Sequence, residues 1–217
     1  MREVRILNPG EPIVFVVDDD LRVREALTSL LSSAGYRVEA FATGAAFLNA
    51  EKPDAPACLI LDLELPDASG LEVQSDLADR EAPPIVFISG HADVPSSVRA
   101  MKSGAIEFLA KPFGEQELLQ AVETGIARDR EARRKRSDLQ ELRRRYDLLT
   151  PREREVLPFV VSGFANKQTA MDLGTSEITI GVHRGQIMRK LDARSLAELV
   201  RMADKLGIPQ RTDSSSK

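Results

Sequence analysis

Short apolar runs alternate with amphipathic segments over the first 126 residues, and this alternation limits the possible folds more than any other feature of the chain. Three of the runs, at residues 13–17, 58–61 and 85–88, have the length of a strand and no polar residue, which is typical of parallel strands buried on both faces. The repetition predicts a doubly wound α/β domain with a five-stranded parallel sheet. The expected strands are Ile13–Val17, Arg37–Phe41, Cys58–Leu61, Ile85–Ser89 and Ala105–Leu109.

Amphipathic helices are expected between these strands. The first carries apolar residues at helical spacing from Val23 to Leu31 and stops at Gly35. The others are expected around Ala45–Ala50, over Gly70–Arg80 and Val94–Ser103, and from Glu115 onward.

Polar side chains stand where four of the expected strands end. Asp18 and Asp19 follow the first strand, Asp62 the third, Ser89 ends the fourth, and Lys111 comes shortly after the fifth. Because ligands of doubly wound sheets bind beyond the carboxyl ends of the strands, these side chains are expected to meet at one edge.

This set of residue types suits phosphoryl transfer. Carboxylates are the hard oxygen ligands that Mg²⁺ prefers, and Mg²⁺ is commonly shared with a phosphate. Asp62 stands alone on the central strand and would be the nucleophile that forms an acyl phosphate. Ser89 and Lys111 would reach the other phosphoryl oxygens. The expected metal ligands are Asp18, Asp19, Asp62 and the backbone carbonyl of Glu64.

Plainer explanations exist for each of these residues. Asp20 before a helix fits an N-cap, and Asp67 in a Pro-Asp-Ala-Ser-Gly segment fits a turn. Asp18 and Asp19 could also be turn residues, Ser89 a cap and Lys111 a solvated loop lysine. Their joint occurrence at four strand ends of one sheet favours a shared site.

Four motifs, in order, resemble the receiver domain of two-component response regulators, which has a flavodoxin-like fold. They are Val16–Asp20, Leu61–Gly70, Ile88–His91 and Phe108–Phe113.

The resemblance implies that Asp62 accepts a phosphoryl group from a sensor histidine kinase, with Mg²⁺ as cofactor. It also implies that Ser89 moves toward the phosphoryl group and that Phe108 turns inward, although Phe108 could equally be ordinary core. His91 would be a loop residue that adjusts the phosphoryl lifetime. The peptide bond between Lys111 and Pro112 is expected to be cis.

A basic segment follows the expected receiver. Residues up to Ile126 carry 10 Lys and Arg against 21 Asp and Glu, whereas the remaining residues carry 20 against 13. The basic half suggests a polyanionic partner. Leu139, Leu142, Tyr146 and Leu149 have coiled-coil spacing, so the segment is either a solvated connector helix or a dimerising coil.

Helix signals return after Leu149. Thr150-Pro151-Arg152-Glu153 is a capped helix start, a short helix is expected over Lys167–Leu173, and Gly174–Ser176 forms a turn before a third helix that ends near Leu191. A fourth helix is expected over Ser195–Leu206. Two short helices joined by a tight turn predict a helix-turn-helix in a small all-α domain, although a basic amphipathic helix without a DNA role has the same pattern.

The whole C-terminal pattern is similar to the LuxR-type DNA-binding domain, and with the receiver it resembles the NarL/FixJ class of response regulators. The resemblance implies binding to double-stranded promoter DNA as a homodimer when phosphorylated. The expected dimer contacts are Leu196, Leu199 and Val200. The expected DNA contacts are Lys167, Ser176, Glu177, Thr179, Ile180, Val182, His183, Arg184 and Lys190, although His183 could equally be a half-buried helix residue.

Three residues depart from the LuxR pattern. Thr169 and Thr175 stand where aliphatic residues are usual, and Gly181 stands where a phosphate-binding lysine is common. We therefore expect DNA binding that is weaker, or more dependent on phosphorylation, than is usual for this class.

The expected organisation is a lead-in (1–12), a receiver (13–128), a basic linker helix (129–147), a helix-turn-helix domain (148–208) and a disordered tail (209–217). Cys58 is the only cysteine and lies in an apolar run, so we expect a buried thiol and a reducing cytoplasm. No apolar run is long enough to span a bilayer, so no membrane partner is expected.

Three alternatives remain. A phosphatase of the aspartyl-phosphate class would need a second Asp where Glu64 stands. A sigma-factor-like subunit would lack the receiver, and a ligand-sensing LuxR regulator would need an apolar cavity. None of the three is the expected function. The resemblance to response regulators implies a protein that is not an enzyme.

Overall fold

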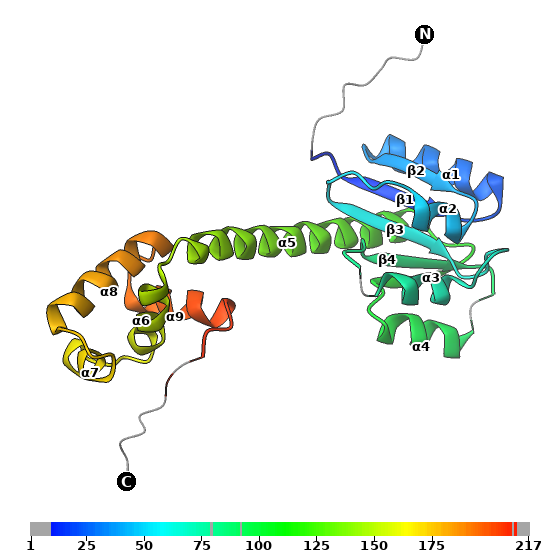
Figure 1. Ribbon diagram of the computed structural model, residues 1–217. Coiled ribbons are helices and arrows are strands. Elements are labelled where there is room, and N and C mark those ends of the chain that lie inside the picture. Colours follow the sequence, from blue (N-terminus) through cyan, green and yellow to red (C-terminus); the bar gives the residue numbers. More distant parts are fainter. Residues whose placement is uncertain (1–9, 79, 92, 210, 212–217) are drawn as a thin grey trace. The chain divides into compact units, whose positions relative to one another are not determined.

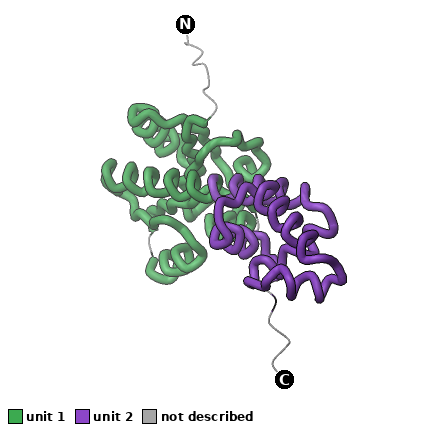
Figure 2. Tube along the Cα trace, turned by 90° about the vertical axis from the view of Figure 1, so that its left-hand side faces the viewer, with its two compact units in different colours: residues 1–133 green, residues 134–217 purple. Residues whose placement is uncertain are grey.

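The computed structural model describes residues 10–78, 80–91, 93–209 and 211. The chain forms two compact units, residues 1–133 and 134–217, which Figures 1 and 2 show and which are described separately. Most of the predicted lead-in and most of the predicted tail lie outside the described residues. Among the described helices, none combines the length and the apolar character needed to cross a bilayer.

The first unit contains a five-stranded parallel sheet in the order β2-β1-β3-β4-β5. The sheet confirms the predicted α/β class. The strand order reverses between β1 and β3, and the register places Val17 beside Leu61 at the carboxyl ends of these two strands. The strands are β1 (Ile13–Val17), β2 (Arg37–Phe41), β3 (Ala57–Asp62), β4 (Ile85–Ser89) and β5 (Glu107–Ala110).

Helices cover both faces of this sheet. One apolar cluster joins the sheet to α2, α3 and α4 through residues such as Phe47 and Val73, and the other joins it to α1 and α5 through residues such as Leu31 and Leu118. The helices are α1 (Leu21–Ser33), α2 (Gly44–Asn49), α3 (Gly70–Leu77), α4 (Val94–Lys102) and α5 (Glu115–Asp147).

Two predicted boundaries shift because backbone hydrogen bonds close the helix ends earlier or later than expected. The Ala105 N–H donates to the carbonyl of Ala100, so Ala105 completes the end of α4 and β5 starts later. The Arg80 N–H donates to the carbonyl of Leu77, three residues back, which is a turn rather than a continuation of α3.

Helix α5 contains 33 residues, and its first half is fixed to the sheet. A Cβ on Gly125 would lie 2.6 Å from the Cys58 sulfur, so the glycine permits close packing of helix on strand. Asp129 is buried and accepts from the Ala57 N–H at 2.8 Å and from Arg133 Nε at 2.7 Å. The predicted linker helix is therefore the continuation of the last receiver helix.

The end of α5 belongs to the second unit. Leu142 and Leu149 are buried in its core, and Tyr146 packs against them. These three residues of the expected coiled-coil seam thus pack within their own chain, which favours the connector over the dimerising coil.

The second unit is all-helical, as predicted, with a short turn between α7 and α8 in which Gly174 has a φ of +61°. Thr150 begins α6 with a capping box closed by Glu153, and Ser176 caps α8 through the Thr179 N–H. The helices are α6 (Pro151–Val161), α7 (Asn166–Asp172), α8 (Glu177–Leu191) and α9 (Leu196–Lys205).

Candidate functional site

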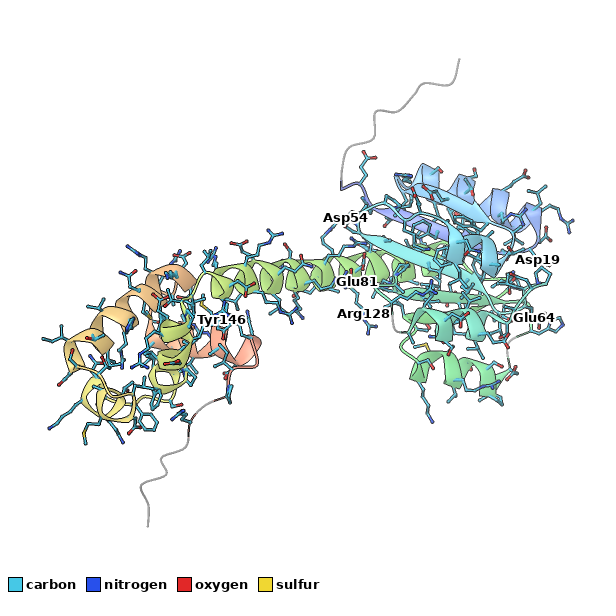
Figure 3. The ribbon with its side chains drawn as sticks, viewed as in Figure 1. Asp19, Asp54, Glu64, Glu81, Arg128 and Tyr146 are labelled. Carbon is cyan, nitrogen blue, oxygen red and sulfur yellow. The ribbon has the colours of Figure 1, made fainter. Side chains whose placement is uncertain are left out.

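Three carboxylates meet at the carboxyl end of the sheet. Asp18, Asp19 and Asp62 each offer an oxygen within 4.8 Å of the others, because β1 and β3 are neighbours and end together. Asp18 and Asp62 are buried, whereas Asp19 is exposed. Asp19 and Glu64 lie at the same end of the receiver, opposite to Asp54 (Figure 3).

Lys111 enters this group from the loop after β5. Its Nζ donates to Asp18 Oδ2 at 2.7 Å and to Asp62 Oδ2 at 2.6 Å, across 93 and 49 residues of sequence. Burial raises the pKa of Asp18, and the hydrogen bond from Lys111 only partly offsets this. Burial also works to lower the pKa of Lys111, but the bonds and charges of Asp18 and Asp62 outweigh it and raise that pKa. The peptide bond after Lys111 is cis, as predicted.

Backbone contacts orient the two buried carboxylates. Asp18 Oδ1 accepts from the Asp20 N–H at 2.9 Å, and Asp62 Oδ1 accepts from the Glu64 N–H at 3.1 Å. Arg24, one turn into α1, donates from Nη1 to the carbonyls of Asp18 and Asp19 at 2.7 and 2.8 Å. Arg24 therefore holds the loop that carries the acidic pair. Sequence reasoning missed it, because nothing in a helix pattern indicates a bond to a carbonyl of the preceding loop.

Gly70 allows α3 to start against the site. A Cβ at this position would lie 2.4 Å from the carbonyl oxygen of Asp62, so only glycine fits without displacing that backbone. Asp67 accepts from the N–H groups of Gly44 and Ala45, which agrees with its predicted structural role. Asp20 caps α1, also as predicted.

Ser89 is fully buried at the end of β4, and its Oγ accepts from the His91 N–H at 3.1 Å. His91 and Glu64 are both exposed, with 3.7 Å between His91 Nδ1 and Glu64 Oε2. Phe108 is half-buried and stacks on Phe87 with 6.2 Å between ring centres. The switch roles of Ser89 and Phe108 stay predictions.

The donor set fits Mg²⁺. It consists of carboxylate oxygens only, and the exposed side of Asp19 leaves solvent access for the waters that Mg²⁺ usually retains. The Lys111 ammonium neutralises part of the charge of the three carboxylates and so reduces the repulsion between them. The carbonyl of Glu64 stays a predicted ligand.

The expected DNA contacts fall into two groups. Ile180 is fully buried in the core of the second unit, so its predicted DNA contact is wrong: the side chain points toward α6 and α7 and cannot reach a base. Arg184 Nη1 donates to the carbonyl of Phe164 at 3.1 Å, and Lys190 Nζ donates to Glu153 Oε2 at 2.7 Å. Both cations thus hold their own domain together, which argues against base contacts by them.

Other expected contacts are accessible. Lys167, Ser176, Glu177 and Val182 are exposed, and Thr179 and His183 are half-buried. The Thr179 hydroxyl shares a hydrogen bond with that of Ser176 at 2.7 Å. Sequence reasoning left out Ile178, whose exposed fraction is 82%. Of the three departures from the LuxR pattern, Thr169 is buried and its hydroxyl donates to the carbonyl of Ala165 at 3.1 Å.

The expected dimer contacts on α9 are only partly available. Leu199 is fully buried within its own domain, so its predicted role at a dimer interface is wrong. Val200 is half-buried and packs against the same core, whereas Leu196 has an exposed fraction of 41%. Leu196 and Val200 stay candidates.

Comparison with known proteins gives the same two-part division. Residues 14–123 match the family described as "Response regulator receiver domain", and residues 147–203 match "Bacterial regulatory proteins, luxR family". The chain is 47% identical over 197 residues to Nodulation protein W of Bradyrhizobium diazoefficiens, covering 90% of this chain and 87% of that protein. It is 46% identical to the response regulator protein TmoT of Ectopseudomonas mendocina, covering 92% and 91%.

Among solved structures, response regulator StyR superposes with a TM-score of 0.80 at 48% identity, covering 90% of this chain and all of that one. A receiver match is not expected for a sigma-factor-like subunit or for a ligand-sensing LuxR regulator, so these two alternatives are excluded. Both matched families are regulatory.

Proposed function

Because the chain belongs to the NarL/FixJ class of two-component response regulators, with a receiver and a LuxR-type domain that regulate transcription, we propose that Asp62 accepts a phosphoryl group from a sensor histidine kinase. Mg²⁺ is the proposed cofactor. Phosphorylation then promotes dimerisation and sequence-specific binding to double-stranded promoter DNA. Because that DNA lies in the bacterial cytoplasm, we propose that the protein acts there. The observation that carries the proposal is the convergence of Asp18, Asp62 and Lys111 within hydrogen-bonding distance.

The proposed reaction transfers a phosphoryl group from the kinase phosphohistidine to Asp62. An Asp62 carboxylate oxygen attacks phosphorus, a P–O bond forms, and the P–N bond of the kinase phosphohistidine breaks. The electron pair of that bond stays on the imidazole, which takes a proton from solvent. Asp18, Asp19 and Asp62 would hold Mg²⁺, which when bound neutralises charge on the phosphoryl oxygens. The ammonium of Lys111 and the hydroxyl of Ser89 would contact the remaining oxygens.

Lys111 connects the chemistry to the switch. In the unphosphorylated state its ammonium bonds Asp62 Oδ2, and an acyl phosphate at that oxygen requires a new partner arrangement. Ser89 ends β4 and its carbonyl accepts from the Lys111 N–H at 2.7 Å, and Phe108 pairs with Phe87 across β5 and β4. A two-state equilibrium of these residues would alter the surface formed by α4, β5 and α5.

The proposal is tested with Asp62→Asn in the full chain. The unmodified protein should take up phosphoryl from acetyl phosphate in the presence of Mg²⁺, and beryllofluoride should raise both its dimer fraction and its DNA affinity. Asp62→Asn should lose the uptake completely and keep the DNA affinity of the untreated protein. Asp76→Asn, an exposed carboxylate of α3, is the control and should behave as the unmodified chain. An Asp62→Asn protein that still responds to both reagents would exclude the mechanism.

A further inference from the structure

Helix α8 presents an apolar stripe to the outside of its domain, formed by Ile178, Val182 and Gly185 and followed by Arg189. We infer that Ile178 and Val182 contact the C5-methyl groups of two thymines in the major groove, so that base selection rests on methyl recognition. This inference deepens the proposed function and rests on its DNA-binding part.

The geometry of α8 defines the stripe. Ile180, Ile187 and Leu191 are buried and mark the inner face of the helix. With 3.6 residues per turn, the residues opposite to this face are 178, 182, 185 and 189. All four are exposed, and the exposed fractions of Ile178 and Val182 are 82% and 56%. These two side chains are the ones that a groove would meet first.

Polar groups able to form hydrogen bonds with base edges lie off this stripe. Arg184 and Lys190 flank the inner face and bond to Phe164 and Glu153 of their own domain. The first two turns of the stripe therefore offer methyl groups only. Aliphatic side chains contact the thymine methyl group in the major groove, so A·T pairs are the matching partners.

Gly185 lets the helix come close to the DNA. Apart from its chain neighbours and the backbone of α8 itself, no described atom lies within 4 Å of the position that its Cβ would take, so this point of the stripe is uncovered. Arg189 follows one turn later, with its guanidinium bonded to Gln186 Oε1 at 2.5 Å. This arrangement fits a major groove in which the backbone at Gly185 lies close to the base edges and the Arg189 guanidinium lies near the phosphates.

The size of the stripe favours DNA over a protein partner. A stable protein interface buries roughly 800 Å² on each side, which two aliphatic side chains beside a glycine do not supply. Residues four apart lie about 6 Å apart along a helix, and base pairs are spaced by about 3.4 Å. The two thymines should therefore lie about two base-pair steps apart, on either strand.

The test uses the full chain activated with beryllofluoride and duplexes selected by it from a randomised pool. Each thymine of the preferred duplex is replaced in turn by deoxyuridine, which removes only the methyl group. At two positions per half-site, this replacement should each time lower the affinity of the protein for the duplex by about fourfold, which corresponds to the loss of one buried methyl group. Ile178→Ala and Val182→Ala should each abolish the sensitivity at one of the two positions.

Leu148→Ala is the matched control, because Leu148 is an exposed aliphatic residue outside α8. It should keep the deoxyuridine pattern of the unmodified chain. DNA affinity that is insensitive to every deoxyuridine would overturn the inference while leaving DNA binding intact, and a changed oligomeric state of the two α8 variants would assign the stripe to a second copy instead. Absence of any duplex binding by the activated protein would instead overturn the proposed function.

Discussion

In the receiver, charged side chains from separate strands meet at one edge of the sheet, whereas in the helix-turn-helix domain two cations of α8, Arg184 and Lys190, bond inward to their own domain. Lys111 joins Asp18 and Asp62 at the site where chemistry is proposed. Lys190 joins Glu153, which caps α6. The first arrangement keeps charge available to a ligand, and the second uses it for the architecture of the domain.

Residue type alone therefore does not identify a binding residue. Lys111, which bonds two carboxylates at strand ends, and Lys190, which bonds the capping Glu153, are both half-buried and have similar bond lengths, 2.6–2.7 Å. They differ in what surrounds them. Asp19 opens the receiver cluster to solvent, whereas Glu153 is enclosed by the Thr150 backbone and by Lys190.

The largest expected effect tests whether charge in the second unit is structural. Glu153→Gln should lower the free energy of unfolding of the helix-turn-helix domain by about 1–3 kcal/mol, because a buried, charge-assisted hydrogen bond to Lys190 is lost. Chemical denaturation followed by circular dichroism measures the change. Glu155→Gln, an exposed partner of Arg152, is the control and should change stability by less than about 1 kcal/mol.

The same pair predicts a pH dependence. Burial works to raise the pKa of Glu153, but the bonds from Lys190 and Thr150 outweigh it and hold that pKa below its ordinary value of 4.5. A carboxyl with a lowered folded-state pKa stabilises the fold above its unfolded pKa, and this contribution is lost as the pH falls through the folded-state pKa. The stability difference between the unmodified chain and Glu153→Gln should therefore be constant above pH 5 and shrink below pH 4.5. A difference that stays constant down to pH 3 would contradict the assignment.

A smaller effect tests whether charge in the receiver serves the ligand site. Arg24→Ala should weaken Mg²⁺ binding by roughly tenfold, because residues that orient metal ligands typically contribute 10–100-fold and Arg24 acts through backbone carbonyls. Titration calorimetry with Mg²⁺ measures this, and the melting temperature should change little. Arg22→Ala removes an exposed ion pair with Asp20 on the same helix and should leave the Mg²⁺ affinity unchanged. Equal losses in both variants would show that general charge, and not the contact with the Asp18 and Asp19 carbonyls, is responsible.

The sequence predicts the receiver site well because topology places it. Once five parallel strands are inferred, their carboxyl ends must share an edge, so Asp18, Asp62 and Lys111 come together regardless of small errors in strand boundaries. What the sequence does not indicate is the support of the site. Arg24 and Gly70 act through backbone atoms, and backbone contacts leave no periodic pattern.

It is harder to predict which residues of α8 face outward, because a small error in the assumed helix rotation exchanges buried and exposed positions. A shift of one residue rotates a side chain by about 100°, and a shift of two separates the buried Ile180 from the exposed Ile178 and Val182. Residue types were misleading as well, since Arg184 and Lys190 are expected DNA contacts but bond to their own domain, whereas the exposed Ile178 is absent from the expected contacts. The same error applies to Leu199 on α9, whose leucine spacing marks the inner face of its own domain.

The smallest expected effect concerns Lys167, an exposed cation of α7 whose side chain forms no hydrogen bond or ion pair with the described residues. If it contacts a phosphate, Lys167→Ala should weaken binding to all duplexes equally, by about three- to tenfold at moderate salt, and should lower the slope of log affinity against log salt by about one. Lys205→Ala on α9 removes the same charge elsewhere on the domain and should leave the slope within error. Because phosphate contacts carry no sequence information, the ranking of duplexes should survive in Lys167→Ala and change in Val182→Ala. A sequence-selective loss in Lys167→Ala would instead place a base contact on α7, and the contrast between an apolar selecting face and a separate electrostatic contact would no longer hold.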